Sequence, residues 1–291
     1  MRSAWPIAFA LLLSTPAVAQ VPAHPPLQRQ YQAGQVLAYH MTGDNDGWHY
    51  TADARGLVAA DAGGLFHEDF VWSNLVSDGA PLALSARMSG FHQTLSLAPD
   101  HNPAPPDLSQ VDPRMIGPVT DLMTVYVDLW LANKLGRLTK PGDHLYFPNP
   151  MVPSWADGRR VRIGEDAIDF DMTLKSLDPA ASVAVLEVKH VPPPETRVHL
   201  PADWMKAVAA GPANNWVQVE KTDDGTFTAA VGQETFDVTL SIDLKDGHIL
   251  HAAMTNPVHT IVRTCSDEAL TQCGEAGTHD ILRQVTIDQI P

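Results

Sequence analysis

The sequence lacks any long apolar run after its N-terminus. The one marked apolar stretch, residues 4–13, has about half of the ~20 apolar residues that a membrane-spanning helix needs. A single positive charge precedes it, and Ala17 and Ala19 follow it as the small residues that a signal peptidase reads. We therefore expect residues 1–19 to be a secretory signal peptide cleaved after Ala19. Residues 20–291 are expected to form a single secreted β-rich domain with no transmembrane segment.

Basic residues are also scarce in this chain. It has 19 Lys and Arg against 34 Asp and Glu, which gives a formal net charge of −15. Proteins bind nucleic-acid backbones and anionic lipid surfaces mainly through Lys and Arg side chains. The composition therefore predicts no nucleic-acid partner and argues against a peripheral membrane role, while the negative charge favours solubility.

Only two cysteines are present, Cys265 and Cys273, and they are eight positions apart. They do not form a Cys-x-x-Cys pair, which argues against a metal site of the zinc type. In an oxidising compartment an even number of cysteines at short range indicates a disulfide. We expect these two residues to be disulfide-bonded.

Sequence motifs that specify a reaction are missing. The chain has no Walker sequence and no Gly-x-Gly-x-x-Gly, so we expect no nucleotide cofactor, and it has no Gly-x-Ser-x-Gly elbow. If residues 67–69 form a strand, only His67 and Asp69 lie on the same face. A metal site would need a third ligand from elsewhere in the chain, so we expect no bound metal. Any catalytic residues stay unknown at this level, because a triad assembled in space cannot be identified from spacing.

What the sequence does contain is strand periodicity. Apolar and polar residues alternate along residues 168–175 and 235–244, which is typical of strands with one buried and one solvated face. Asp46-Gly47 between two alternating segments predicts a β-hairpin. The final strands are expected at residues 249–254, 259–264 and 281–290. Residues 20–30, rich in Pro and Gln, are expected to be a loose arm.

One central segment has helical character instead. Thr120 is a suitable N-cap, Gly136 a suitable end, and the residues between them are apolar nearly all round, which is typical of a buried helix. A second, short helix is expected over residues 202–208. We predict a mainly β (α+β) fold with a large curved antiparallel sheet, or unclosed barrel, packed on a central helix at about residues 121–136. Two β-sandwiches joined by a helical segment are the alternative.

Five residues are candidates for a ligand site between helix and sheet. Asp128 lies among apolar neighbours, and a buried carboxylate needs a partner or a raised pKa, which is a property enriched at functional sites. An Asp satisfied by Arg or backbone at the helix periphery is the plainer interpretation. Four aromatic residues are candidates to line an apolar cavity, although their spacing also fits an ordinary core: Phe70, Trp72, Tyr126 and Trp130.

These observations favour a periplasmic or extracellular binding protein that holds an apolar or amphipathic ligand, such as a lipid, between a curved sheet and the central helix. In architecture this layout resembles the periplasmic lipoprotein carriers with an unclosed barrel. Two alternatives stay open: a hydrolase acting on envelope or extracellular material, and a structural or interaction module of the envelope. The sequence leaves open the identity of the ligand, the physiological partner and the oligomeric state.

Overall fold

A computed structural model describes residues 24–104, 106–152, 161–208 and 214–291 of the chain. The predicted signal peptide, residues 1–19, lies outside the described residues. As the alternation predicts, the fold is mainly β, and the described residues form 14 antiparallel strands in one unclosed sheet and one long central helix. One continuous sheet excludes the alternative of two separate sandwiches.

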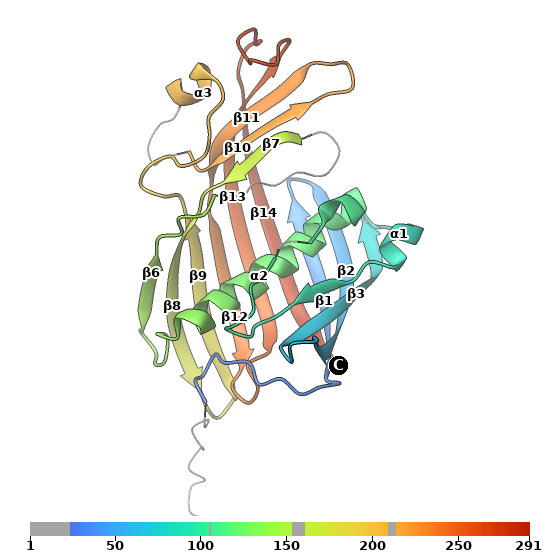
Figure 1. Cartoon of the computed structure of the whole chain (residues 1–291), viewed down its shortest axis with the longest axis vertical. Coiled ribbons are helices and arrows are strands. Elements are labelled where there is room, and N and C mark those ends of the chain that lie inside the picture. Colours follow the sequence, from blue (N-terminus) through green and yellow to red (C-terminus); the bar gives the residue numbers. More distant parts are fainter. Residues whose placement is uncertain (1–23, 105, 153–160, 209–213) are drawn as a thin grey trace, which may run out of the picture.

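The strands follow one another around a strongly curved sheet, and the central helix crosses its inner face diagonally (Figure 1). The strand order is β4-β3-β2-β1-β14-β13-β12-β9-β8-β6, with β5 added beside β3. The strand bounds are β1 Val36–Asn45, β2 Trp48–Ala60, β3 Phe66–Ser77, β4 Ala80–Pro81, β5 Gln93–Leu95, β6 His144–Phe147, β7 Val161–Asp166, β8 Asp169–Asp178, β9 Val183–Val191, β10 Trp216–Lys221, β11 Phe227–Glu234, β12 Phe236–Asp243, β13 Ile249–Cys265 and β14 Gly277–Ile290.

The sheet forks along β13. Strand β12 pairs with the first part of β13 and β11 with its second part, so the sheet divides into a β12-β9-β8-β6 branch and a β11-β10-β7 branch. The two predicted strands over residues 249–254 and 259–264 are therefore one strand, which passes through Pro257. A proline lacks the backbone N–H that a strand ladder uses. Pro257 lies where β11 and β12 separate, and its carbonyl accepts the N–H of Thr235 at 3.3 Å.

The central helix, α2, spans Ile116–Leu135 and ends at Gly136 as predicted, with a left-handed φ of 60° that suits glycine. It begins earlier than predicted, so Thr120 is not its N-cap. The Thr120 hydroxyl instead donates to the carbonyls of Ile116 and Gly117 within the helix. Among the described residues, no helix is both long enough and apolar enough to cross a membrane. The short helical elements are α1 (Ala86–Ser89), α3 (Asp203–Ala207) within the predicted range, and the 3-10 turns η1 (Leu108–Gln110) and η2 (Pro113–Met115).

Two hydrophobic cores flank the fork. The larger lies between α2 and the main curved sheet, where Leu122, Val125 and Leu129 of the helix are almost fully buried. The smaller lies among β10, β11, α3 and the residues before α3, and it includes Met205 and Val217. The polar side chains described below gather between the two cores.

The expected hairpin and disulfide are both present. Asp46 and Gly47 have left-handed φ values of 48° and 88° between β1 and β2, the geometry of a tight hairpin turn. Cys265 at the end of β13 is bonded to Cys273 in the connection to β14. The disulfide therefore closes a short loop beside the smaller core, in which Cys265 is fully buried.

We expect the double variant Cys265→Ser/Cys273→Ser to have a free energy of unfolding about 2–3 kcal/mol lower than that of the wild type. The reason is that the crosslink restricts a short loop in the unfolded chain. Urea unfolding monitored by circular dichroism measures this difference. Reduction of the wild type should cause a loss of similar size and should not change the double variant. Equal stability of the oxidised wild type and the double variant would contradict the prediction.

The N-terminal arm differs from expectation, because residues 24–30 are docked and not loose. Leu27 and Arg29 are buried, and the N–H of Gln30 donates to the carbonyl of Asp246 at 2.6 Å. The Arg29 Nε donates to Glu68 Oε1 at 3.2 Å inside the core. The composition of the arm resembles a loop, but one buried ion pair and one buried leucine fix its position. The arm runs along the lower end of the sheet (Figure 1).

Candidate ligand-binding cleft

An aromatic row crosses the inner face of four strands. Strand pairing places Phe147 (β6), Phe170 (β8), His190 (β9) and Phe236 (β12) side by side. The ring centroids of Phe170 and His190 are 4.9 Å apart, and those of His190 and Phe236 are 4.8 Å apart. We call these four residues the aromatic row. Its ring faces and edges provide a largely apolar wall opposite α2.

A cleft of about 230 Å³ lies between this row and α2. Its helix side comes from half-buried positions one turn apart, and its sheet side comes from the aromatic row and neighbouring residues. None of its lining residues is exposed. A mostly apolar wall with a few polar groups is the usual composition of a small-molecule site. The lining consists of Met123, Thr124, Val127, Asn149, Asp166, Ile168, Phe170, His190 and Phe236.

Asp128 lies on α2 and is connected to the cleft by a hydrogen bond with His190, which lines it. The two side chains are buried, and His190 Nε2 lies 2.6 Å from Asp128 Oδ1. The partner is thus a histidine from β9 and not the arginine or backbone group of the plainer sequence interpretation. Burial raises the pKa of Asp128, and the nearby His190 opposes that rise. Its second oxygen, Oδ2, has no hydrogen-bond partner among the described residues.

Two further carboxyl groups meet at the fork. Asp166 ends β7 and lines the cleft, and Glu234 ends β11; their side chains are hydrogen-bonded to each other. Burial, followed by the repulsion and hydrogen bond of Glu234, raises the pKa of Asp166 well above its ordinary value. Burial also raises the pKa of Glu234, and the hydrogen bond from Asp166 opposes this rise. We call Asp166 and Glu234 the carboxyl pair.

Two buried asparagines hold the carboxyl pair in place. Asn215 Nδ2 lies 3.4 Å from Asp166 Oδ1, and Asn215 Oδ1 accepts the N–H of Glu234 at 2.9 Å. Asn256 Nδ2 lies 3.4 Å from Glu234 Oε2. Both asparagine side chains are fully buried. The pair is therefore held by one amide group next to β10 and by another on β13, at the fork of the sheet.

The neighbouring cationic side chains are committed to other acids. Arg283 donates to Asp121 Oδ1 at 2.5 Å, and Arg197 donates to Asp169. Asp121 also accepts the Tyr50 hydroxyl at 2.7 Å. Within the described part of the chain, no lysine or arginine forms an ion pair with Asp166 or Glu234. Arg283 and His190 nevertheless lower the pKa of Glu234 through their charge, although each is bonded to another acid.

The five residues predicted to bind ligand are divided by the structure. Phe70, Trp72 and Tyr126 lie in the larger core, where Phe70 and Tyr126 contact edge to face at 5.7 Å. The Tyr126 hydroxyl donates to Glu68. Trp130 is half-buried and donates to the carbonyls of Ala98 and His101. None of the four aromatic residues lines the cleft, and Asp128 reaches it only through His190.

Sequence reasoning missed the residues that do form the cleft. His190 occupies an inward position in β9, in step with Leu186 and Val188, and a polar residue at such a position is the available signal. Asp166 and Glu234 carry no comparable signal. They are the last residues of β7 and β11, and acidic residues are common at strand ends. Only the pairing of strands at the fork brings the two residues together.

Residues 67–69 do not form a common site. Glu68 points into the core toward Arg29, whereas Asp69 bonds His92 on the other face at 2.8 Å. A second cluster has ligand atoms that lie close enough to one another to hold a metal ion. It consists of Asp243, Asp246 and His248. Asp246 is however already paired with Arg29 and hydrogen-bonded to Gln35 and His248. These protein partners account for the cluster without a metal ion.

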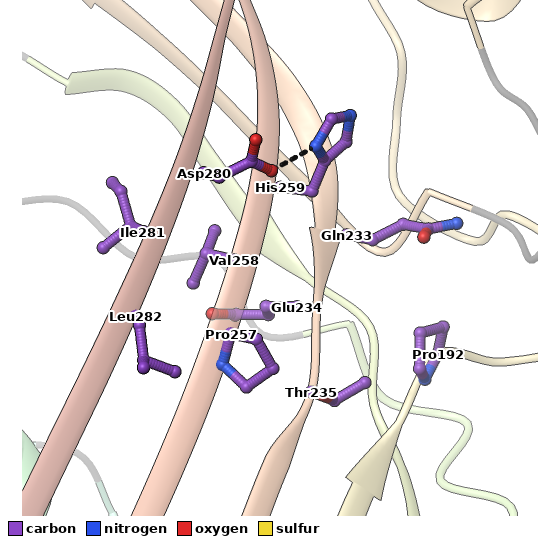
Figure 2. Close-up of a pocket in the computed structure, with 10 residues that line it drawn as sticks. All are labelled: Pro192, Gln233, Glu234, Thr235, Pro257, Val258, His259, Asp280, Ile281 and Leu282. Carbon is purple, nitrogen blue, oxygen red and sulfur yellow. Dashed lines mark hydrogen bonds and ion pairs between the residues drawn. The ribbon is translucent and has the colours of Figure 1, made fainter.

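A larger groove of about 450 Å³ lies beside the fork (Figure 2). Strand alternation directs Pro257 and Leu282 away from α2, because their neighbours Asn256 and Arg283 point toward it. His259 Nδ1 and Asp280 Oδ1 meet at its rim, 2.7 Å apart. Four of the groove's lining residues are exposed, and the buried aromatic and polar side chains of a small-molecule site are concentrated in the cleft instead. The cleft is therefore the better candidate site.

Comparison of the chain with models of protein families, with curated proteins and with solved structures finds no match. The cleft is thus interpreted from its own geometry.

Proposed function

We propose that this is an exported binding protein that holds an apolar or amphipathic small molecule in the cleft between α2 and the aromatic row. The observation that carries the proposal is the cleft itself, which lies beneath Met123 and Val127 and combines apolar walls with the buried His190 and the half-buried Asp166. Its volume of about 230 Å³ is smaller than the ~300–1,000 Å³ of pockets for drug-sized ligands. It therefore suits one short chain or one ring of a ligand.

The helix composition supports the same proposal. Met123 and Val127 are only half-buried, although they lie on the side of α2 that faces the aromatic row. A ligand in the cleft would remove this remaining apolar surface from water, which stabilises a complex by about 25 cal/mol per Å². The export signal and disulfide expected from the sequence would place such a carrier in the periplasm or outside the cell.

Filling the cleft is expected to weaken the binding of a neutral apolar probe. Val127→Phe adds a ring beneath the helix, so toluene, a neutral probe with a single ring, should bind at least about tenfold more weakly than to the wild type. Isothermal titration calorimetry with the probe measures this. Val71→Phe is the matched control, because Val71 is exposed on β3 and should leave the affinity unchanged. Equal probe affinity in all three proteins, or no binding by the wild type, would overturn the proposed function.

The hydrolase alternative has one observation in its favour. The hydrogen bond between His190 and Asp128 orients an imidazole at the wall of a cleft that also contains Asp166, and catalytic acid–base sites combine such groups. A screen with chromogenic esters and glycosides separates the two functions. Turnover by the wild type that is lost in His190→Gln would establish the hydrolase, and turnover that is unaffected by this variant would come from another site.

A further inference from the structure

We propose that the cleft binds a neutral carbonyl compound with a single aromatic ring, whose carbonyl oxygen accepts a hydrogen bond from Asn149 Nδ2. This inference rests on the proposed function and adds the chemical class of the ligand. A hydrocarbon of the same shape would leave this amide group without a partner, and a carboxylate of the same size would bring a charge that the lining does not balance.

Asn149 is the lining residue that carries the first step. It is only 9% exposed, and three of its four polar atoms have protein partners. Its N–H donates to Asp169 Oδ1 at 3.0 Å, its carbonyl accepts from Arg197, and its Oδ1 accepts the N–H of Met151 at 3.2 Å. The fourth polar atom, Nδ2, forms no hydrogen bond within the described part of the chain.

The orientation of this amide group is fixed. A backbone N–H is a donor, so the side-chain atom that accepts the N–H of Met151 is the oxygen, and the other atom is the nitrogen. Nδ2 also keeps accessible surface, because it is not among the fully buried side-chain atoms that lack a partner. Asp169, which holds the N–H of Asn149, is itself bonded by Arg197 and by the Tyr146 hydroxyl. The amide is therefore a pre-organised donor at the wall of the cleft, which reduces the entropy lost when it binds an acceptor.

The other polar side chains of the lining are each bonded to another residue. The Thr124 hydroxyl donates to a carbonyl within α2, His190 Nε2 lies against Asp128, and Asp166 Oδ1 lies 3.4 Å from Asn215 Nδ2. The described lining contains no lysine or arginine, so a carboxylate head group would be buried near Asp166 without a counter-charge. The cleft therefore favours a neutral hydrogen-bond acceptor.

The shape of the cleft carries the second step. Three of its nine lining residues are the rings of Phe170, His190 and Phe236, and Met123 lies on the helix side. Neighbouring rings are tilted by 69° and 47°, so a flat ring can pack edge to face against them, and thioether sulfur also contacts aromatic rings favourably. A cavity of about 150 Å³ can hold benzene. The 230 Å³ of the cleft therefore accommodates one ring with a substituent of about three non-hydrogen atoms, at roughly 30 Å³ each.

Two compounds with the same shape and different polarity test the donor. Acetophenone is a ring with a three-atom carbonyl substituent, and α-methylstyrene replaces its carbonyl oxygen with a methylene group. Isothermal titration calorimetry gives the ratio of the two affinities in the wild type and in Asn149→Leu. The difference in hydrophobicity between the compounds cancels, because the same two are compared in each protein. We expect the variant to reduce the affinity for acetophenone relative to α-methylstyrene by about five- to tenfold, the effect of one hydrogen bond.

A second variant and a control accompany this measurement. Asn149→Asp keeps the shape of the side chain and an oxygen for the N–H of Met151, and it should cause a similar relative loss if Asn149→Leu is unstable. Asn133→Leu is the matched control. Asn133 lies on α2 and also has an Nδ2 without a partner among the described residues, but it lines a different cavity, beside Leu27. Its replacement should leave the ratio unchanged.

Two further ligands test the ring and the charge. 1-Cyclohexylethanone has the non-hydrogen atoms of acetophenone without the flat ring, and it should bind to the wild type at least about threefold more weakly. Benzoate has the ring and a charged head group, and it should bind more weakly than acetophenone because no lysine or arginine of the described lining faces it.

The outcomes separate this inference from the proposed function. If toluene and α-methylstyrene bind to the wild type but the ratio is unchanged in both Asn149 variants, the carbonyl proposal is wrong and the binding function stands. The same conclusion follows if 1-cyclohexylethanone or benzoate binds as tightly as acetophenone. If none of the compounds binds to the wild type, both fail.

Discussion

Replacing Arg29 with methionine is expected to destabilise the protein by about 3–5 kcal/mol, the usual cost of removing one partner of a buried ion pair. The side chains of Arg29 and Glu68 are both fully buried, and Arg29 also donates to Gln35 Oε1 at 2.8 Å. Burial raises the pKa of Glu68, and Arg29 is the largest influence that opposes this rise. Without Arg29, Glu68 would be left with the Tyr126 hydroxyl as its remaining donor.

Denaturant unfolding of three variants measures this contribution. Arg55→Met is the matched control, because Arg55 is exposed on β2 and its replacement should change stability by less than about 0.5 kcal/mol. Arg29→Met combined with Glu68→Met should recover most of the loss, since no unpaired charge is left in the core. If Arg29→Met were as stable as Arg55→Met, the docking of the N-terminal arm through this pair would be refuted.

The parts of the fold that could be predicted from sequence depend on local pattern. Alternation in β8 and β12 follows from one buried and one solvated face, and it needs no knowledge of the neighbouring strands. The end of α2 at Gly136 and the hairpin at Asp46-Gly47 likewise depend on conformations that a few residues favour by themselves. The start of α2 was not predicted, because Gly117 and Pro118 resemble a break before the helix although they form its first turn.

The arrangement of the cleft could not be predicted because each of its key contacts is long-range. Asp128 and His190 are 62 positions apart, and Asp166 and Asn215 are 49 apart. Their contacts depend on which strands are neighbours and on the fork in β13, and a single alternation pattern defines neither. The apolar surface of α2 did indicate that its surroundings would be mostly buried. It did not indicate that Met123 and Val127 would border a cleft while Tyr126 would lie in the core.

Replacing His190 with phenylalanine is the second change with a large expected effect. A phenylalanine keeps a ring between Phe170 and Phe236, so the aromatic row loses little packing. It removes the nitrogen that bonds Asp128 Oδ1 at 2.6 Å, and both oxygens of a fully buried carboxyl group then lack a partner. We expect a loss of about 3–5 kcal/mol near neutral pH, measured by denaturant unfolding. The control His251→Phe breaks a bond of similar length to Asp288 on the exposed face and should cost less than about 1 kcal/mol.

The dependence of this loss on pH distinguishes a buried carboxyl group from lost packing. Burial already raises the pKa of folded Asp128 above 3.8, and removal of His190 removes what opposes that rise. Between 3.8 and the raised value, the folded state binds a proton that the unfolded state has released, so stability falls as pH increases. The His190→Phe variant should therefore lose more stability than the wild type between pH 4 and pH 8. Adding Asp128→Leu should abolish the excess slope and restore most of the stability, whereas a loss independent of pH would assign the effect to packing alone.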